Sequence, residues 1–407
     1  MHLEILIVTT RVPYPPHKGD KLKVYNIVKN LAGKNSVKVL CLYRKRSELE
    51  YLDNIRSLGA DIEAIHHSFL RSAFNLLFFF FSKEPIQVLL YKSTRLARRL
   101  SEVVRENSPD VVYFHFIRSA QYIDSVPGSK TTRVLDFTDA VSLYLTRFAN
   151  AEKNPFVKFG VGVERDRIAG YEKIAEKFDS CFICSPTDRE YLSGKEIQAD
   201  FRILPNGVDT RLFVKSERSY DEDRIIFTGN MPYFPNEDAA VYFAQVVMPI
   251  IWKLRPTAKF YIVGGRPTKK IRRLASDKII VTGFVENIAA EYLKSAVAIA
   301  PMRFGAGTLN KVIEAIVLGL PVVATSIAVS GLAEEVKEFV EVADGPQDFA
   351  KKVAGFLAKH SGNTCHSEDD FEKVRRMLSW ENIIERFADD LQELSMEKKA
   401  KRPVQMK

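Results

Sequence analysis

Cysteine is scarce in this chain: its 407 residues include four, Cys41, Cys181, Cys184 and Cys365. A secreted domain held together by disulfides would be much richer in cysteine. Cys181 and Cys184 form a C-x-x-C pair, but the pair lies in a strand-like run, with no second pair and no histidine at ligand spacing. We therefore expect buried core thiols, with a redox or zinc site as the less favoured alternative.

Long apolar runs are also missing. The longest, FNLLFFFF at residues 74–81, is far shorter than the roughly 20 residues that span a bilayer. The first residues lack the basic lead-in and cleavage site of a signal peptide, so we expect a cytoplasmic protein. Arg71 and Lys83 flank the run, which suits either an interfacial helix resting on an anionic membrane or a buried helix of the N-terminal core.

Two common ligand-binding motifs are absent. No G-x-G-x-x-G follows any predicted strand, and GGRP at 264–267 lacks the third glycine, which argues against a nicotinamide-dependent oxidoreductase. No D-x-D stands at the end of a predicted strand, so we expect no obligatory metal ion.

Acidic residues are under-represented, giving a net charge of +9. Residues 1–110 hold 18 Lys and Arg against 11 Asp and Glu, and the tail from Met396 holds five basic residues and one acid. A basic face suits an anionic membrane or another polyanion, or it serves solubility alone. A basic protein that binds nucleic acid or membrane without catalysis therefore stays a rival interpretation.

What the chain does contain is a regular alternation of short apolar runs with helical patterns. Predicted strands lie at 3–9, 37–43, 110–116, 133–137, 180–185 and 201–206 and, after a polar stretch at 214–223, at 224–229, 258–265, 278–284, 296–302 and 321–325. Predicted helices include 19–33, 163–178 and 380–394. Such alternation predicts two parallel, doubly wound α/β domains, which bind ligands at the carboxyl ends of their strands.

The segment 301–325 is the most informative. A strand ends at Met302, a loop with Gly305 and Gly307 follows, and a helix is predicted from about Thr308 to Leu318. The start of such a helix binds anions well, and Lys311 in the first turn can meet a diphosphate. Glu314 lies three residues on, on the same face, where it can accept from a sugar or ribose hydroxyl. An ordinary surface lysine and glutamate remain the plain alternative.

GTLNKVIEAIVLGLPVVAT (307–325) resembles the donor-binding signature of the GT-B glycosyltransferases of family 4. Three further segments resemble one branch of that family, associated with exosortase and exopolysaccharide systems: residues 9–32, PNGVD at 205–209, and 224–243. The resemblance implies two Rossmann-like domains that face each other across a cleft. The acceptor domain would be 1–214 and the nucleotide-sugar domain 224–378, and residues 379–407 would form a helix that packs back toward the first domain, followed by a basic tail.

The resemblance also assigns residues. Lys311 would pair with the donor diphosphate, Glu314 would hold the ribose, and His115 would face the reacting sugar. The rest of the implied donor site comprises Gly19, Gly229, Asn230, Arg266, Phe284, Val285, Arg303, Gly307, Thr308, Leu309 and Asn310.

Two positions depart from the family's pattern. Ala306 stands where many members have a first glutamate, and Asn230 stands where many have an arginine. Arg303, Arg266 or Lys18 are the candidates for supplying the missing charge. His115 also suits a satisfied core histidine, and Asp139 suits either an acceptor contact or a helix cap.

The expected activity is a metal-independent hexosyltransferase of the retaining kind. It would move a sugar from a UDP- or GDP-type donor to a glycan or a lipid-linked acceptor in surface polysaccharide biosynthesis. No cofactor is expected beyond that donor substrate, nor a nucleic-acid partner, and peripheral contact with the inner face of the plasma membrane is expected. A GT-B nucleotide-sugar epimerase is the main alternative.

Overall fold

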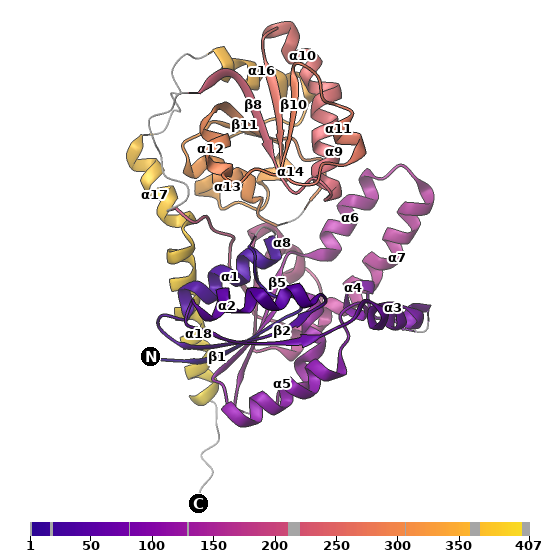
Figure 1. The fold of residues 1–407 in the computed structure, drawn as a ribbon, viewed down its shortest axis with the longest axis vertical. Helices are drawn as coiled ribbons and strands as arrows, with labels where there is room; N and C mark the ends of the chain where they lie inside the picture. The colour runs from indigo at the N-terminus through magenta and orange to yellow at the C-terminus, as the bar shows by residue number, and fades with distance from the viewer. Residues whose placement is uncertain are drawn as a thin grey trace, which may run out of the picture. The chain divides into compact units, whose positions relative to one another are not determined.

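The computed structural model describes residues 2–16, 19–80, 82–127, 130–210, 220–305, 307–358 and 367–400. The chain forms two compact units (Figure 1). The N-terminal unit comprises Met1–Cys184, Asp188–Leu204 and Ile383–Lys407, and the C-terminal unit comprises Ser185–Thr187 and Pro205–Asn382.

A parallel sheet of seven strands forms the centre of the N-terminal unit, in the order β3-β2-β1-β4-β5-β6-β7. Strands β2 and β3 lie in succession on one side of β1, and β4 lies on its other side. The topological switch point is therefore between β1 and β4. The strands are β1 (Glu4–Thr9), β2 (Ser36–Tyr43), β3 (Asp61–His66), β4 (Val111–His115), β5 (Thr132–Thr138), β6 (Ser180–Ile183) and β7 (Phe201–Ile203).

Helices lie on both faces of this sheet, as Figure 1 shows for α1 on one face and α5 on the other. Leu96 and Leu100 of α5 share a core with Leu6 and Val8 of β1. The helices are α1 (Gly19–Leu31), η1 (Arg46–Tyr51), α2 (Leu52–Arg56), α3 (Phe69–Leu77), η2 (Phe78–Phe80), α4 (Ile86–Leu89), α5 (Thr94–Asn107), η3 (Ile117–Ser125), α6 (Val141–Ala151), α7 (Pro155–Tyr171), η4 (Glu172–Lys177) and, from Asp188 and Ile383 onward, α8 (Pro186–Ser193) and α18 (Trp380–Ala400).

The helix that the sequence predicts at 163–178 begins earlier, at Pro155, and ends earlier, at Tyr171, with the short η4 after it. Asn154 caps its start, because its Oδ1 accepts from the amides of Phe156 and Val157. Proline in the first turn suits that position, since it has no N–H to leave unpaired. The Asn-Pro pair is therefore the start signal that the sequence reading missed.

The C-terminal unit has a parallel sheet of six strands, in the order β10-β9-β8-β11-β12-β13, with its switch point between β8 and β11. The strands are β8 (Asp221–Thr228), β9 (Lys259–Val263), β10 (Ile279–Gly283), β11 (Ser295–Ala300), β12 (Val322–Ala324) and β13 (Val340–Val342). The helices are α9 (Phe234–Tyr242), η5 (Phe243–Val247), α10 (Met248–Leu254), α11 (Lys269–Arg272), α12 (Ile288–Leu293), α13 (Asn310–Val317), α14 (Ser326–Val329), α15 (Glu334–Lys337), α16 (Pro346–Ala358) and α17 (Glu368–Leu378).

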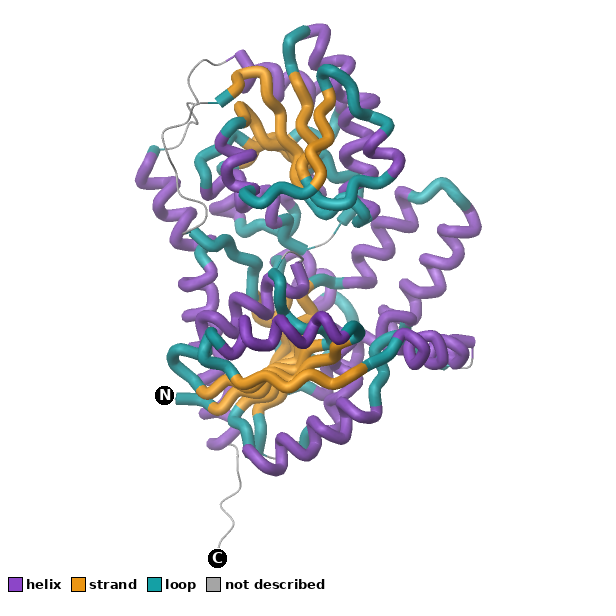
Figure 2. The backbone as a smooth tube through the Cα atoms, in the orientation of Figure 1, coloured by secondary structure: helices purple, strands orange, loops and turns teal. Residues whose placement is uncertain are grey.

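Each unit thus has helices around a parallel sheet, as Figure 2 shows, which confirms the doubly wound architecture that the sequence predicts. The start of the C-terminal unit, however, lies before the polar stretch. Val208 exchanges backbone hydrogen bonds with Leu378 and Trp380, which ties residues 205–210 to this unit. Among the described residues, no helix is both long enough and apolar enough to cross a membrane.

Candidate active site

The predicted donor residues of the C-terminal unit converge on its switch point. Gly229 and Asn230 follow β8, and Arg303 follows the neighbouring β11, two residues before Gly305. Because the strands are parallel, both loops emerge at the same edge of the sheet, and α13 begins there. This is where open α/β sheets bind their ligands.

Close backbone approaches at this edge require glycine. A Cβ on Gly264 would lie 1.8 Å from the carbonyl oxygen of Gly229, and a Cβ on Gly229 would lie 2.7 Å from Nδ2 of Asn236. Because Gly229 has no side chain, the Asn236 amide can pack directly against its backbone. Asn236 is buried there, and its Nδ2 donates to the carbonyl of Asn230 at 3.0 Å.

Lys311 points into this arrangement from the first turn of α13. Its Nζ donates to Oδ1 of Asn236 at 2.6 Å and lies 4.3 Å from the centre of the Phe227 ring. Burial lowers the pKa of Lys311 to about 7, against the attraction of the Glu314 carboxylate. Among the described residues, no carboxylate oxygen lies within 4.0 Å of its Nζ. The ammonium is therefore held by a neutral amide, and an added anion would stabilise its charge.

Glu314 lies one turn further along α13 and is fixed by Tyr292 of α12. The Tyr292 hydroxyl donates to Oε2 of Glu314 at 3.1 Å and lies 2.6 Å from Oγ1 of Thr228. Burial raises the pKa of Glu314 to about 6, although the Tyr292 hydroxyl and Lys311 oppose that rise. The carboxylate is thus placed as an acceptor for a ligand hydroxyl, on the same helix as Lys311.

The loop before α13 is held by contacts distant in sequence. A Cβ on Gly331 would lie 2.1 Å from the carbonyl oxygen of Gly307, so only glycine fits there. The hydroxyl of Thr308 donates to the Gly331 carbonyl at 3.1 Å, and Asn206 Nδ2 contacts the Thr308 carbonyl at 3.3 Å and Oδ1 of Asn310 at 3.1 Å.

The start of α13 itself has no side-chain cap among the described residues, because Leu309 occupies the cap position. Its first amides and the positive end of its dipole remain suited to an anion. Ala306 lies outside the described residues.

The remaining predicted donor residues differ in their surroundings. Arg303 is already paired, since its Nε donates to Oδ2 of Asp238 at 2.8 Å and its Nη2 bonds the other oxygen. Arg266 is exposed in the loop after β9, and Phe284 is exposed after β10. Val285 packs against the core. Lys18, the third candidate for the missing charge, lies outside the described residues.

In the N-terminal unit, His115 ends β4 and is buried. Its Nε2 lies 3.0 Å from the carbonyl oxygen of Asp20, and its Nδ1 lies 3.5 Å from Oδ2 of Asp136. Asp136 is fully buried and bonded to Lys23 at 2.9 Å and to the Tyr113 hydroxyl at 2.5 Å. Burial alone would raise the pKa of Asp136, but Lys23 and these hydrogen bonds hold it well below its ordinary value.

Gly19 opens α1 beside this network. It is exposed, and an added Cβ would meet no protein atom within 4 Å among the described residues. The protein itself therefore gives no steric reason for glycine at this position, which leaves room for a ligand.

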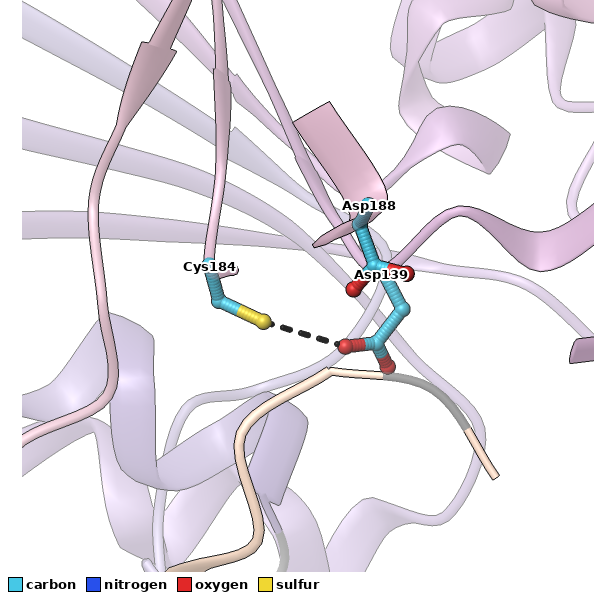
Figure 3. Close-up of side chains that lie close together, drawn as sticks. All are labelled: Asp139, Cys184 and Asp188. Atoms are coloured by element: carbon cyan, nitrogen blue, oxygen red, sulfur yellow. Dashed lines mark hydrogen bonds between the residues drawn. The ribbon is translucent and has the colours of Figure 1, made fainter. Parts of the chain in front are cut away.

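A second group of titratable side chains lies at the ends of β5 and β6 and the start of α8: Asp139, Cys184 and Asp188 (Figure 3). Their ligand-type atoms lie within 4.8 Å of one another, and the Cys184 thiol donates to Oδ1 of Asp139 at 3.2 Å. Burial, and then the charge of Asp188, raise the pKa of Asp139 to about 7. A pKa near 7 lets Asp139 hold a proton close to neutral pH.

The sequence did not predict four residues that shape the donor site: Asn236, Tyr292, Gly331 and Asn206. Asn206 lies in PNGVD and Asn236 in the segment 224–243, both of which resemble the family, but neither residue was predicted to shape the site. Tyr292 and Gly331 carry no local signal, because their roles depend on contacts with residues 22 and 23 positions away.

The two parallel sheets define the class of fold: the chain has the GT-B fold of glycosyltransferases. HepE of Anabaena, in a complex with UDP and glucose, superposes with a TM-score of 0.64 at 12% identity, covering 96% of this chain and 100% of that one. Sucrose-phosphate synthase from Thermosynechococcus elongatus gives 0.66 at 14% identity, covering 97% and 100%. The predicted GT-B architecture is therefore confirmed.

Within that class, residues 222–359 match the family model described as glycosyl transferases group 1. A relative in Klebsiella pneumoniae, described as an uncharacterized 44.6 kDa protein in the cps region, is 23% identical over 382 residues, or 88% of this chain and 92% of that protein. The match to the family model covers the C-terminal sheet and the Lys311 site.

Proposed function

We propose that the protein is a glycosyltransferase that transfers a hexose from a nucleotide-diphosphate sugar. The observation that carries the proposal is Lys311, held by the Asn236 amide at the start of α13 and at a switch point. In sugar transfer, negative charge grows on the departing diphosphate. A preorganised ammonium and the amides of a helix start stabilise that charge without a metal ion.

We assign the other donor contacts as the resemblance to the GT-B glycosyltransferases of family 4 implies them. Glu314 accepts from the ribose hydroxyls, and the amides of Thr308, Leu309 and Asn310, with Gly307 before them, surround the diphosphate. Gly229 and Asn230 line the phosphate pocket, and Phe284 and Val285 border the base. Arg303 and Arg266 are the nearby cations, although Arg303 must leave Asp238 to contact the donor.

For the N-terminal unit we propose the acceptor role, with a retaining reaction. Gly19 approaches the donor, and His115 faces the reacting sugar. Nε2 of His115 lies 3.0 Å from the Asp20 carbonyl, so this contact requires the tautomer that carries its hydrogen on Nε2. His115→Gln, which can keep that hydrogen bond, should retain more transfer activity than His115→Ala.

The setting we propose is surface polysaccharide assembly on the cytoplasmic side of the membrane. Support comes from the cps-region relative and from structural neighbours in complexes with UDP-glucose, or with UDP and a glycan such as fondaparinux. A UDP- or GDP-type donor and a glycan or lipid-linked acceptor are the corresponding ligands.

A donor panel tests the proposal. UDP-, GDP- and ADP-sugars are incubated with a lipid extract that supplies acceptors, and free nucleotide is measured with and without EDTA. We expect one donor to release nucleotide, EDTA to have no effect, and Lys311→Met to lose at least 100-fold in rate. Lys351→Met, at an exposed position on α16, is the matched control and should match the wild type.

The panel also separates the epimerase alternative. An epimerase would convert the sugar of the donor while the nucleotide stays attached, so product analysis would show a changed sugar and no nucleotide release. That result, or nucleotide release that Lys311→Met leaves unchanged, would contradict the proposal.

We further propose that α3 rests on an anionic membrane, because its apolar side chains are exposed and its uncharged polar side chains face the protein. Its two uncharged polar residues face the protein: Ser72 is buried and donates to the Leu90 carbonyl at 2.9 Å, and Asn75 donates to the carbonyls of Leu89 and Lys92. Its apolar residues face outward, with Leu70 80%, Phe74 58% and Leu77 66% exposed.

Charge complementarity identifies the occupant of this surface. Residues 67–98 contain five Lys and Arg and one acid, Glu84, which pairs with Lys92. Arg71 on α3 and Arg95 and Arg98 on α5 are exposed. Apolar side chains beside cations suit the interface of an anionic bilayer, where each cation near the surface contributes about 1 kcal/mol.

Vesicle sedimentation tests α3 independently of catalysis. The protein should bind phosphatidylglycerol vesicles and bind neutral phosphatidylcholine vesicles at least tenfold more weakly. The Leu70→Ser, Phe74→Ser, Leu77→Ser triple variant should lose binding, whereas Leu254→Ser, at an exposed leucine of the C-terminal unit, should not. If the triple variant still binds vesicles, or if the wild type is a dimer that the triple variant converts to monomer, the membrane assignment of α3 is wrong.

A further inference from the structure

Three arginines surround one tyrosine at the carboxyl edge of the N-terminal sheet. The guanidinium carbons of Arg118, Arg44 and Arg11 lie 4.9, 5.0 and 5.9 Å from the centre of the Tyr91 ring. We call these four residues the arginine cluster. Neither the donor site nor the role predicted for His115 uses it.

The sheet topology explains why these residues meet. Arg11 follows β1, Arg44 follows β2, and Arg118 follows β4, and these three strands are neighbours in the sheet. Arg11 and Arg118 stand on either side of the switch point between β1 and β4. The arginine cluster therefore occupies the position in the N-terminal unit where a ligand is expected.

Hydrogen bonds hold most of the cluster in place. The Tyr122 hydroxyl bonds the backbone carbonyl of Tyr91, and Arg11 donates twice to the Tyr91 hydroxyl, at 3.1 and 2.8 Å. Arg118 is 9% exposed and donates to Oγ1 of Thr10 at 2.6 Å. The guanidinium groups of Arg11 and Arg118 are thus held by hydrogen bonds before any ligand arrives, which reduces the ordering cost of binding.

Positive charge in the cluster exceeds its compensation. Among the described residues, Asp20 is the carboxylate that pairs with it, bonding Arg11 at 2.9 Å and Arg118 at 3.1 Å. Glu48 accepts from the Arg44 backbone amide and not from its guanidinium. Burial and then the proximity of Arg11 lower the pKa of Arg118, against the attraction of Tyr91 and Asp20.

N–H groups also remain for a ligand. A guanidinium has five N–H donors. In contacts with described residues Arg11 uses three, Arg118 two and Arg44 one. The side chain of Arg11 is 39% exposed and Arg44 is exposed, so the cluster opens to solvent.

We infer that the arginine cluster binds a phosphate or diphosphate group, the anionic end of a phosphorylated acceptor. Planar guanidinium forks match phosphate oxygens in pairs, and three of them with one carboxylate favour a multiply charged anion over a single carboxylate. That the anion belongs to an acceptor rests on the proposed function, whereas the binding of the anion itself does not.

Calorimetry on the full-length protein with its donor site saturated by UDP tests this site. Inorganic pyrophosphate and geranyl diphosphate are titrated into the wild type and into Arg44→Ala, an exposed change that should not disturb folding. We expect both probes to bind, and Arg44→Ala to weaken them at least tenfold. Arg56→Ala, at an exposed arginine of the same unit, should leave binding unchanged.

Other outcomes would overturn the inference. Loss of pyrophosphate binding in Lys311→Met, or its displacement by UDP, would place the anion in the donor site. Equal binding to Arg44→Ala would mean that the cluster is structural. Tighter binding of glucuronate than of pyrophosphate would assign a carboxylate ligand instead. A transferase that lacks activity but still binds pyrophosphate through Arg44 would refute the proposed function and leave this site intact.

Discussion

Lys23 and Lys311 illustrate two uses of a lysine near the start of a helix at a switch point. Lys23 of α1 and Asp136 have fully buried side chains and form an ion pair at 2.9 Å, and Lys23 also donates to the Leu204 carbonyl. Lys311 of α13 bonds only neutral groups among the described residues, the Asn236 amide and the Met302 sulfur. The first lysine has its anion within the protein, so it stabilises the fold. The second has no carboxylate of a described residue within 4.0 Å, so it is suited to a ligand.

Breaking the Lys23 pair should have the largest effect. Lys23→Met leaves Asp136 charged and buried without its cation, which should cost about 3–5 kcal/mol of unfolding free energy. Urea denaturation measures this cost. Arg56→Met removes an exposed pair with Asp53 and should cost less than about 1 kcal/mol. If both variants lost the same unfolding free energy, the buried Lys23–Asp136 pair would be no more stabilising than the exposed Arg56–Asp53 pair.

The matching change at the second lysine should affect binding and spare stability. Lys311→Met removes an ammonium that burial already disfavours, so the unfolding free energy should stay unchanged or rise. Affinity for UDP should fall about 100-fold, because a charge-assisted contact with the diphosphate is lost, worth about 3 kcal/mol. A variant that unfolds as readily as Lys23→Met would show that Lys311 is structural too.

Asp139 provides the corresponding test for a buried acid, and we expect a smaller change in the free energy of unfolding. Its pKa of about 7 in the folded protein exceeds the ordinary 3.8, so the folded state binds this proton more tightly. The stabilisation is complete below pH 3.8 and is lost as pH rises toward 7. Between pH 6 and 7 the wild type should lose about 1 kcal/mol that Asp139→Asn does not lose. Thermal unfolding across this range checks it; parallel curves would contradict the raised pKa.

Periodicity and motif spacing were enough to predict the parallel sheets and the shared face of Lys311 and Glu314, because both depend on local sequence. The Asn236 contact was not predictable, since it joins residues 75 positions apart across a glycine that leaves room for it. The arginine cluster likewise depends on which strands are neighbours.

The sequence showed the apolar run of α3 but not which face of the helix lies against the protein. The apolar run indicated either an interfacial or a buried helix, and both alternatives have the same composition. Ser72 and Asn75 decide which side faces the protein, through hydrogen bonds to carbonyls of the segment 89–92. A sequence shows which residues are polar, but it does not show where their partners lie.

Proton uptake on nucleotide binding is the most direct test of the account. At pH 8 Lys311, with its pKa of about 7, is mostly neutral, and the UDP diphosphate should restore its proton. Titrating UDP in two buffers of different ionisation enthalpy should show uptake of close to one proton by the wild type and none by Lys311→Met, with affinity falling up to tenfold per pH unit above 7. Equal binding heats in the two buffers, with pH-independent affinity, would contradict the claim that the diphosphate supplies the anion that Lys311 lacks.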